Sequence, residues 1–154
     1  MKSTLLSESA AERTFVLILD NQEEAFGTIQ GFCTSEGLSA AMVTAIGAFA
    51  EATVGWFDFE GRTYREIPVG EQCEVLSLLG DVAAGDDGKA SLHLHAVLGL
   101  RDGSTKGGHF LKGIVHPTLE VVLRETPAQL RRRRRKDLGI ALIDLETDAG
   151  QRRA

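Results

Sequence analysis

The chain has 154 residues, of which 43% are hydrophobic and 25% are charged, a balance that is typical of one globular domain and excludes a disordered or fibrous chain. Its formal net charge of -5 is unevenly distributed, because residues 131–136 (RRRRRK) hold six of the 17 basic residues. The rest of the chain has 11 basic residues and all 22 acidic ones. The body of the domain is therefore acidic and repels phosphate, which excludes a nucleic-acid surface spread over the whole domain.

The beginning of the chain predicts neither export nor a membrane anchor. Serine and glutamate interrupt residues 1–14 (MKSTLLSESAAERT), so the continuous apolar core of a signal peptide is lacking. The longest weakly polar run, residues 38–50, is shorter than the roughly 20 apolar residues that a membrane-spanning helix needs. Cys33 and Cys73 lie in apolar surroundings without C-x-x-C spacing, which favours buried, reduced thiols. We therefore expect a cytoplasmic protein.

The first predicted elements are a strand and a helix. Residues 13–20 (RTFVLILD) are apolar and β-branched, as in a strand that is largely buried on both faces. A helix is predicted next, over residues 21–36, because Asp20 and Glu23 have the spacing of a capping box and Gly37 stands where a C-terminal cap belongs. Apolar residues recur at helical spacing at Ala25, Phe26, Ile29, Phe32 and Cys33.

The rest of the chain predicts a sheet. Short apolar runs alternate with turn signals such as Glu60-Gly61 and Asp86-Asp87-Gly88. Many short strands joined by tight turns indicate a mainly antiparallel sheet, so the predicted fold is α/β of the α+β type with one principal early helix. The predicted strands cover residues 40–46, 52–59, 64–68, 73–81, 91–98, 109–115 and 119–124.

Three of the four histidines lie within residues 91–113 (SLHLHAVLGLRDGSTKGGHFLKG). In the first strand of this stretch the side chains alternate between faces, so His93 and His95 lie on one face and Leu92 and Leu94 on the core face. Histidines at positions i and i+2 of a strand lie about 6–7 Å apart and can lean onto one ion. This half of the stretch therefore has the spacing of a two-ligand metal site.

A hairpin leads from this strand to the next, where His109 follows the glycine pair Gly107-Gly108. The length of the loop decides whether His109 faces the core or the other two histidines. An odd number of residues separates His95 from His109, which is consistent with the two lying opposite each other on one face of the sheet. Three neutral imidazoles with an open fourth position suit a divalent metal, zinc in particular, although iron, nickel and copper accept the same ligands. The alternative is a group of surface histidines without an ion. His116 is predicted to be a loop histidine outside the site.

Two carboxylates are candidates for a supporting role at such a site. Glu51 and Glu120 could orient a ligand histidine or act as acid or base on a metal-bound water, and the alternative is that both are solvated charges at strand ends. The sequence contains no G-x-S-x-G motif, no P-loop and no G-x-G-x-x-G motif. Serine hydrolysis and nucleotide binding therefore have no support.

With these residues the chain resembles the PPC domain family, a domain shared by plants and prokaryotes. The resemblance rests on RTFVLILDNQEE, VTAIGAFAEATVGWFD, EVLSLLGDV, SLHLHAVLGLRDGSTKGGHFLKG and LEVVL, in the family's order over residues 12–126. It implies a compact homotrimeric domain with metal at the histidine cluster in some prokaryotic members, and His93, His95 and His109 as the ligands. Residues 1–11 would then be a flexible N-terminus, and residues 127–154 a partly docked basic extension.

The resemblance also raises the question of DNA. Plant members bind AT-rich DNA through separate R-G-R-P segments, which this sequence lacks, and prokaryotic members are described provisionally as DNA-binding proteins. Candidate nucleic-acid contacts are therefore confined to the basic run, whose alternative interpretation is a solvated charged face. They are Arg131, Arg132, Arg133, Arg134, Arg135 and Lys136.

Three functions are compatible with these observations. The first, which rests on the residues, is a homotrimeric module that binds a divalent metal and with it a small-molecule ligand. The second is a DNA-associated regulator that uses the basic run. The third, by analogy with other three-histidine sites, is a metal-dependent hydrolase or lyase with Glu51 or Glu120 as acid or base.

Overall fold

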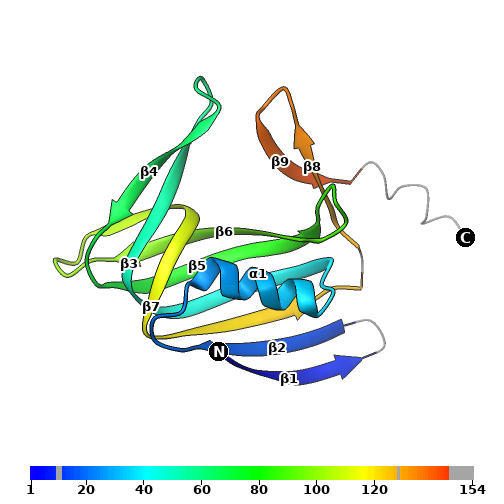
Figure 1. Ribbon diagram of the computed structural model, residues 1–154, viewed down its shortest axis with the longest axis horizontal. Helices are drawn as coiled ribbons and strands as arrows, with labels where there is room; N and C mark the ends of the chain where they lie inside the picture. Colours follow the sequence, from blue (N-terminus) through cyan, green and yellow to red (C-terminus); the bar gives the residue numbers. More distant parts are fainter. Residues whose placement is uncertain (10–11, 128, 146–154) are drawn as a thin grey trace, which may run out of the picture.

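A computed structural model describes residues 1–9, 12–127 and 129–145 of the chain. The described residues form nine strands and one α-helix (Figure 1). In chain order they are β1 (Lys2–Ser9), β2 (Glu12–Leu19), α1 (Ala25–Ser35), β3 (Ala40–Asp58), β4 (Thr63–Val69), β5 (Cys73–Ala84), β6 (Ala90–Gly99), β7 (Thr105–Glu125), β8 (Arg131–Arg135) and β9 (Ile140–Asp144).

The strands form one sheet in the order β1-β2-β7-β3-β5-β8-β9, with β4 added to β3 and β6 added to both β5 and β7. The ladders between these strands are antiparallel apart from a single parallel pair between β5 and β8, so the prediction of a mainly antiparallel sheet with one early helix is confirmed. Because β6 pairs with β5 and β7, which both pair with β3, these four strands close a circuit and the sheet curls on itself.

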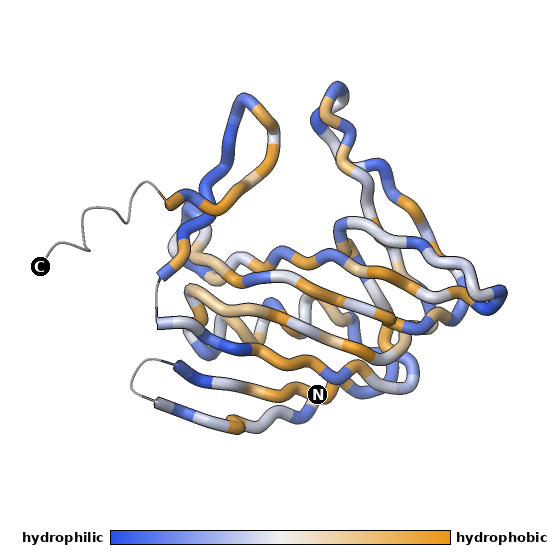
Figure 2. Tube along the Cα trace, turned by 180° about the vertical axis from the view of Figure 1, so that it is seen from behind, coloured by the Kyte–Doolittle hydropathy of each residue, from blue (hydrophilic) through white to orange (hydrophobic). Residues whose placement is uncertain are grey.

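The core lies between α1 and the face of the sheet that the helix covers (Figure 1). Alternate residues of the strands, among them Leu17, Leu94 and Leu119, point to this face and are fully buried, as is Ile29 of the helix. Burial of such a side chain contributes about 1.5–3 kcal/mol. Figure 2 views the molecule from behind and shows the strands in front, with the helix on their far side.

The helix begins later than its sequence predicts, at Ala25 instead of residue 21. Glu24 is the N-cap, and its carboxylate accepts hydrogen bonds from the backbone N–H groups of Phe26 (3.0 Å) and Gly27 (2.6 Å). Glu23 accepts a bond from the backbone N–H of Asp20 (2.7 Å), so half of the predicted capping box is present one turn before the helix.

The C-terminal end of the helix is as predicted. Gly37 has a φ of 66°, in the left-handed region that favours glycine. The backbone N–H of Leu38 donates to the carbonyl oxygen of Cys33 (2.9 Å), and that of Gly37 donates to Thr34 (3.2 Å), which is the Schellman pattern. Cys33 and Cys73 are buried free thiols, and burial raises the pKa of Cys33 to about 12.

Two pairs of predicted strands are each one long, bent strand. Residues 40–46 and 52–59 join in β3, and residues 109–115 and 119–124 join in β7. The bend in β3 lies at Gly47, where a Cβ atom would collide with the carbonyl oxygen of Thr118, and β-bulges follow it in the β3–β7 ladder. Gly47 and Pro117 were predicted to end strands. Instead, β3 and β7 bend together at these residues, and their ladder resumes beyond each bend.

Strands occur at both chain ends, where a flexible N-terminus (residues 1–11) and a partly docked basic extension (residues 127–154) were expected. Residues 2–9 form β1, which pairs along β2, because an edge strand offers unpaired backbone groups to an adjacent segment. Residues 10–11 lie outside the described part of the chain. Of the extension 127–154, the arginine run forms β8 of a hairpin with β9, while residues 128 and 146–154 also lie outside the described part. No helix of the described residues is long and apolar enough to cross a membrane.

The close pairing of β5 with β6 generates a stability prediction. A Cβ atom at Gly80 would collide with the backbone carbonyl oxygen of His93, so Gly80→Ala must push the two strands apart. We expect a loss of about 3 kcal/mol or more in the free energy of unfolding, measured by urea denaturation. Gly31→Ala is the control, because an added Cβ on the exposed helix face meets nothing within 4 Å and should stabilise by up to about 1 kcal/mol. Equal stabilities of the two variants would contradict the prediction.

Candidate metal centre

Strand β6 holds two of the three clustered histidines on its outward face. Its burial pattern alternates as predicted, with Leu92, Leu94 and Ala96 buried against the core. His93 is half-buried and His95 is exposed on the opposite face. The apolar residues hold the strand in place, and the pleat of the strand thereby aims both imidazoles away from the core.

The third histidine comes from β7 and lies directly opposite His95 in the β6–β7 register. The predicted shared face is therefore confirmed for His109. Its neighbour Gly108 has a φ of 157°, and a Cβ atom there would lie 2.5 Å from the carbonyl oxygen of Gly55. Only glycine lets β7 approach β3 this closely, and this approach sets the position of His109 beside β6.

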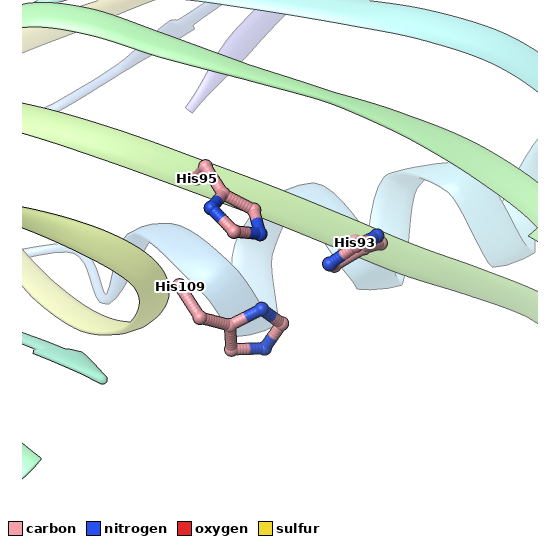
Figure 3. Close-up of side chains that lie close together, drawn as sticks. All are labelled: His93, His95 and His109. Atoms are coloured by element: carbon pink, nitrogen blue, oxygen red, sulfur yellow. The ribbon is translucent and has the colours of Figure 1, made fainter. Parts of the chain in front are cut away.

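The three imidazoles converge (Figure 3). Ring centroids lie 5.1 Å apart for His93 and His95, 5.0 Å for His93 and His109, and 5.4 Å for His95 and His109. One nitrogen of each ring lies within 4.8 Å of the others. Ligands at about 2.0–2.1 Å from a tetrahedral ion lie roughly 3.4 Å apart, so modest ring rotations bring the set to coordination distance.

A tyrosine ring covers the most buried of these imidazoles. Tyr64 of β4 stacks on His109, with ring centroids 4.5 Å apart and an angle of 22° between the planes. Phe57 packs edge-on against Tyr64, with ring centroids 5.0 Å apart. Sequence reasoning missed Tyr64, because only the β3–β4 pairing brings residue 64 next to residue 109. The sequence offered one signal for it, since Tyr64 is the one tyrosine of the chain and begins a predicted strand.

Two charged residues that the sequence did not connect with the histidines lie beside them. Asp81 faces His93 across the β5–β6 register, and one carboxylate oxygen lies 4.0 Å from His93 Nδ1. The other oxygen accepts a hydrogen bond from the guanidinium of Arg132. An aspartate inside the apolar stretch EVLSLLGDV was a usable signal for Asp81, whereas nothing local distinguishes Arg132 from the arginines around it.

The electrostatic environment favours neutral imidazoles. The pKa of His109 is lowered to about 4, chiefly by burial and to a smaller extent by the neighbouring His93, His95 and Arg132. Burial and Arg132 also lower the pKa of His93, and they outweigh the opposite effect of Asp81. Histidine binds metal in its neutral form, so the surroundings keep these rings in the state that an ion requires.

A metal ion fits the donor set. His109 Nδ1 is buried and has no hydrogen-bond partner, and it is the one buried side-chain nitrogen or oxygen in the described residues of which this is true. Such orphaned atoms are rare because they lose their hydration without compensation. Three imidazoles within reach of one point are a set that zinc and related ions accept, and coordination by an ion would remove the deficit.

The two candidate glutamates lie elsewhere. In the β3–β7 ladder Glu51 lies opposite Ile114, whereas His109 lies opposite Gly55. The four residues of β3 between Glu51 and Gly55 correspond to a distance of roughly 13 Å. Glu120 is separated from His95 by the widths of β3 and β5, again roughly 14 Å. His116 also lies apart: it belongs to β7, not to a loop, and its Nδ1 is 2.8 Å from Asn21 Oδ1. The carboxylate next to the histidines is Asp81.

The arginine run does not present a uniform basic surface. Arg132 is 5% exposed. Two others have acidic partners, with Arg133 Nε 3.2 Å from Asp144 and Arg135 Nη2 3.0 Å from Asp137. The side chains of Arg131, Arg134 and Lys136 are exposed.

These observations define a class: a single α+β domain whose curled antiparallel sheet carries a three-histidine centre on the face away from its helix. The sequence profile of the Plants and Prokaryotes Conserved domain, abbreviated PCC or PPC, matches residues 6–127. The chain belongs to this family.

Solved structures agree with this assignment. A plant- and prokaryote-conserved protein from Pyrococcus horikoshii is 30% identical, with a TM-score of 0.80 over 93% of this chain and 94% of the other. A metal-containing protein from Archaeoglobus fulgidus is 32% identical, with a TM-score of 0.78 over 85% and 92%. A protein from Bacteroides thetaiotaomicron, described provisionally as DNA-binding, is 25% identical, with a TM-score of 0.82 over 94% and 98%. Among curated proteins, none matches the chain at a significant level.

Proposed function

We propose that this chain is a metal-binding module that holds one divalent ion, zinc by ligand preference, through His93, His95 and His109. The observation that carries the proposal is the convergence of three imidazole nitrogens within 4.8 Å, on a ring set that includes the buried, unpartnered Nδ1 of His109. A relative that is 32% identical over 85% of this chain is described as metal-containing, which supports the same assignment.

The ligand set also limits what the centre does. Three protein ligands leave a fourth position of a tetrahedral ion for water or for a small molecule, and a bound ion polarises whatever occupies it. The chain's own contribution is to lower the pKa of His93 and His109, to stack Tyr64 on His109 and to place Asp81 next to His93. Glu51 and Glu120 lie roughly 13–14 Å from the histidines by their places in the register, so this geometry supports binding of a small ligand better than the acid–base role expected of them.

The metal proposal predicts a defined stoichiometry. Protein purified without a histidine tag should contain about one ion per chain by elemental analysis. The double variant H93A/H95A should lose it, because one remaining imidazole binds zinc weakly. His116→Ala is the matched control, since His116 is a histidine of β7 outside the cluster and should leave the metal content unchanged. An ion retained by the double variant, or zinc-free wild-type protein after exposure to zinc, would overturn the proposal.

We further propose that the module assembles as a homotrimer, as the family resemblance implies, through the face of the sheet that α1 leaves open. Register pairs align Val16, Val122, Thr44, Leu79 and His95 in one row across five strands of this face. A contiguous apolar patch on a soluble domain is typical of an interface between subunits. Its large exposed side chains are Ile46 (60%), Leu76 (55%), Leu79 (54%) and Val122 (39%).

The assembly proposal predicts a change of mass. Wild-type protein should sediment with three times the chain mass in analytical ultracentrifugation. Leu79→Arg should shift it to the mass of one chain, because a charge at the centre of the apolar patch would be buried without a partner. Leu145→Arg is the control, since Leu145 is 66% exposed but follows β9, which β8 separates from the strands of the patch. Monomeric wild-type protein, or a trimeric Leu79 variant, would contradict the assignment of this face.

DNA contact through the β8–β9 hairpin is a second candidate function. It is supported by the exposed cations Arg131, Arg134 and Lys136, and by the relative described provisionally as DNA-binding. Arg132 is buried, and Arg133 and Arg135 already have acidic partners. The phosphate contacts of the hairpin would therefore come from Arg131, Arg134 and Lys136. Three copies of the hairpin in a trimer would add their weak contacts on one duplex.

This candidate predicts a salt-dependent complex. Retardation of duplex DNA at low salt should be lost in the variant R131Q/R134Q/K136Q, and the slope of log affinity against log salt should fall by about 0.9 for each phosphate contact removed. The matched control removes three exposed cations elsewhere, as K89Q/R101Q/K106Q. If wild-type protein gives no retardation at low salt, or both variants retard DNA equally, the hairpin is not a DNA contact.

A further inference from the structure

The arginine run contains one buried member. Arg132 is 5% exposed, whereas the other four arginines of β8 are exposed. Among the charged side chains of the described residues, only Asp58 is buried to a similar degree, at 9%. A guanidinium taken out of water is strongly destabilising unless its N–H groups are bonded, so the contacts of Arg132 explain why the strand keeps it there.

Those contacts lead to the metal centre. Arg132 Nη1 donates to the carbonyl oxygen of Ser91 (2.8 Å) and to its hydroxyl (3.2 Å). Arg132 Nη2 donates to Asp81 Oδ1, and Asp81 Oδ2 lies 4.0 Å from His93 Nδ1. Ser91 stands two residues before His93 on the same face of β6. A continuous series of contacts therefore joins the C-terminal hairpin to one of the three candidate ligands.

Strand β8 and the residue before it also contact the domain through their backbone. Strand β8 pairs with β5 at a single residue pair, Ala84 with Arg131. Beyond it, the backbone N–H of Ala84 donates to Leu130 (2.8 Å), and the backbone N–H of Arg134 donates to Asp86 (3.3 Å). An isolated two-stranded hairpin is marginally stable in water, so its docking depends on such anchors. Arg132 is the buried one among them.

Asp81 is placed to couple docking of the hairpin to binding of an ion at His93. A carboxylate that accepts the Nδ1 proton of a ligand histidine selects the tautomer whose Nε2 is free for the ion, and it raises the basicity of that nitrogen. The Arg132 guanidinium holds Asp81 next to His93. At 4.0 Å, Asp81 Oδ2 lies just beyond hydrogen-bond distance of His93 Nδ1. Binding of an ion to His93 makes the Nδ1 proton a stronger donor and favours closing this gap, and the thermodynamic coupling between the two events must be reciprocal.

We propose that docking of the β8–β9 hairpin and metal binding are coupled through Arg132 and Asp81: the docked hairpin raises the affinity of the histidines for the ion, and the bound ion holds the hairpin down. Arg132 is thus a positioning residue of the centre. This inference rests on the proposed metal function. It also assigns the hairpin, which lies beyond the matched residues 6–127, a role in the site.

Two measurements on the full chain test the coupling. Zinc affinity is measured by competition with a chromophoric chelator, and docking is measured by amide hydrogen exchange of residues 131–144 with and without zinc. In wild-type protein we expect zinc to slow exchange in the hairpin about tenfold or more, while amides of β1 at the far edge of the sheet keep their rates. In Arg132→Gln we expect zinc affinity to fall about 10- to 100-fold and the zinc effect on the hairpin to disappear.

Matched variants separate coupling from general destabilisation. Arg134→Gln removes an exposed charge from the same strand and should match wild-type protein in both measurements. Arg132→Lys retains a charge that can bond Asp81 but cannot also reach Ser91, so it should restore part of the lost affinity. Asp81→Asn should reproduce the Arg132→Gln effects, with no further loss when the two are combined.

The outcomes distinguish the coupling from the metal proposal. If wild-type protein binds no zinc, both are overturned. If it binds zinc but hairpin exchange is unchanged by the ion, or if Arg132→Gln binds zinc as tightly as Arg134→Gln, the metal proposal stands and the coupling is wrong. Should Arg132→Gln not fold, the comparison of wild-type protein with and without zinc and the Asp81→Asn variant still decide the question.

Discussion

The antiparallel ladder between β3 and β7 is the constraint on which the rest of the structure depends. It runs from Ala41 opposite Glu125 to Gly55 opposite His109 and passes three register shifts on the way. Its first part carries β2 and β5 on the two sides, and the bent second part brings β7 against β6. Without the bends the two strands would form a flat ribbon, and His109 would lie away from the face that holds His93 and His95. The cluster of three histidines is therefore a product of sheet curvature.

The centre combines an apolar setting with one balanced pair of charges. Burial under Tyr64 keeps His109 neutral, and Asp81 next to His93 has Arg132 as a counter-charge. An unpaired carboxylate at this position would favour protonated imidazole, while an unpaired guanidinium would be costly to bury. Together they cancel much of each other's effect and leave a site that an ion can enter. The family's matched residues 6–127 supply the histidines and Asp81, whereas Arg132 comes from the segment that follows them.

The open face of the sheet connects this centre with the proposed assembly. The row that begins at Val16 ends at His95 and His109, so the apolar patch and the histidines lie on one continuous surface. A second copy seated on the patch would lie next to the histidines and would limit access of solvent and ligand to them. The β8–β9 hairpin reaches the same histidines through Arg132, which donates to Asp81 beside His93. The hairpin and the apolar patch thus border the same cluster of histidines.

Local sequence determined those features that depend on neighbours along the chain. Alternation in SLHLHAVLG placed two histidines on the face away from the core, helical spacing located α1 to within a few residues, and Gly37 marked its end, because strand pleat and helix period are properties of short segments. Strand ends were less predictable: glycine and proline signal turns, yet at Gly47 and Pro117 both backbones of a ladder bend together and pairing continues. Only the tertiary structure brought Tyr64, Asp81 and Arg132 to the histidines and left Glu51 and Glu120 apart, since contacts between strands distant in sequence depend on register and curvature. For the same reason six consecutive basic residues, alike in sequence, divide into one buried partner of Asp81 beside the histidines, two members of surface ion pairs and three exposed cations.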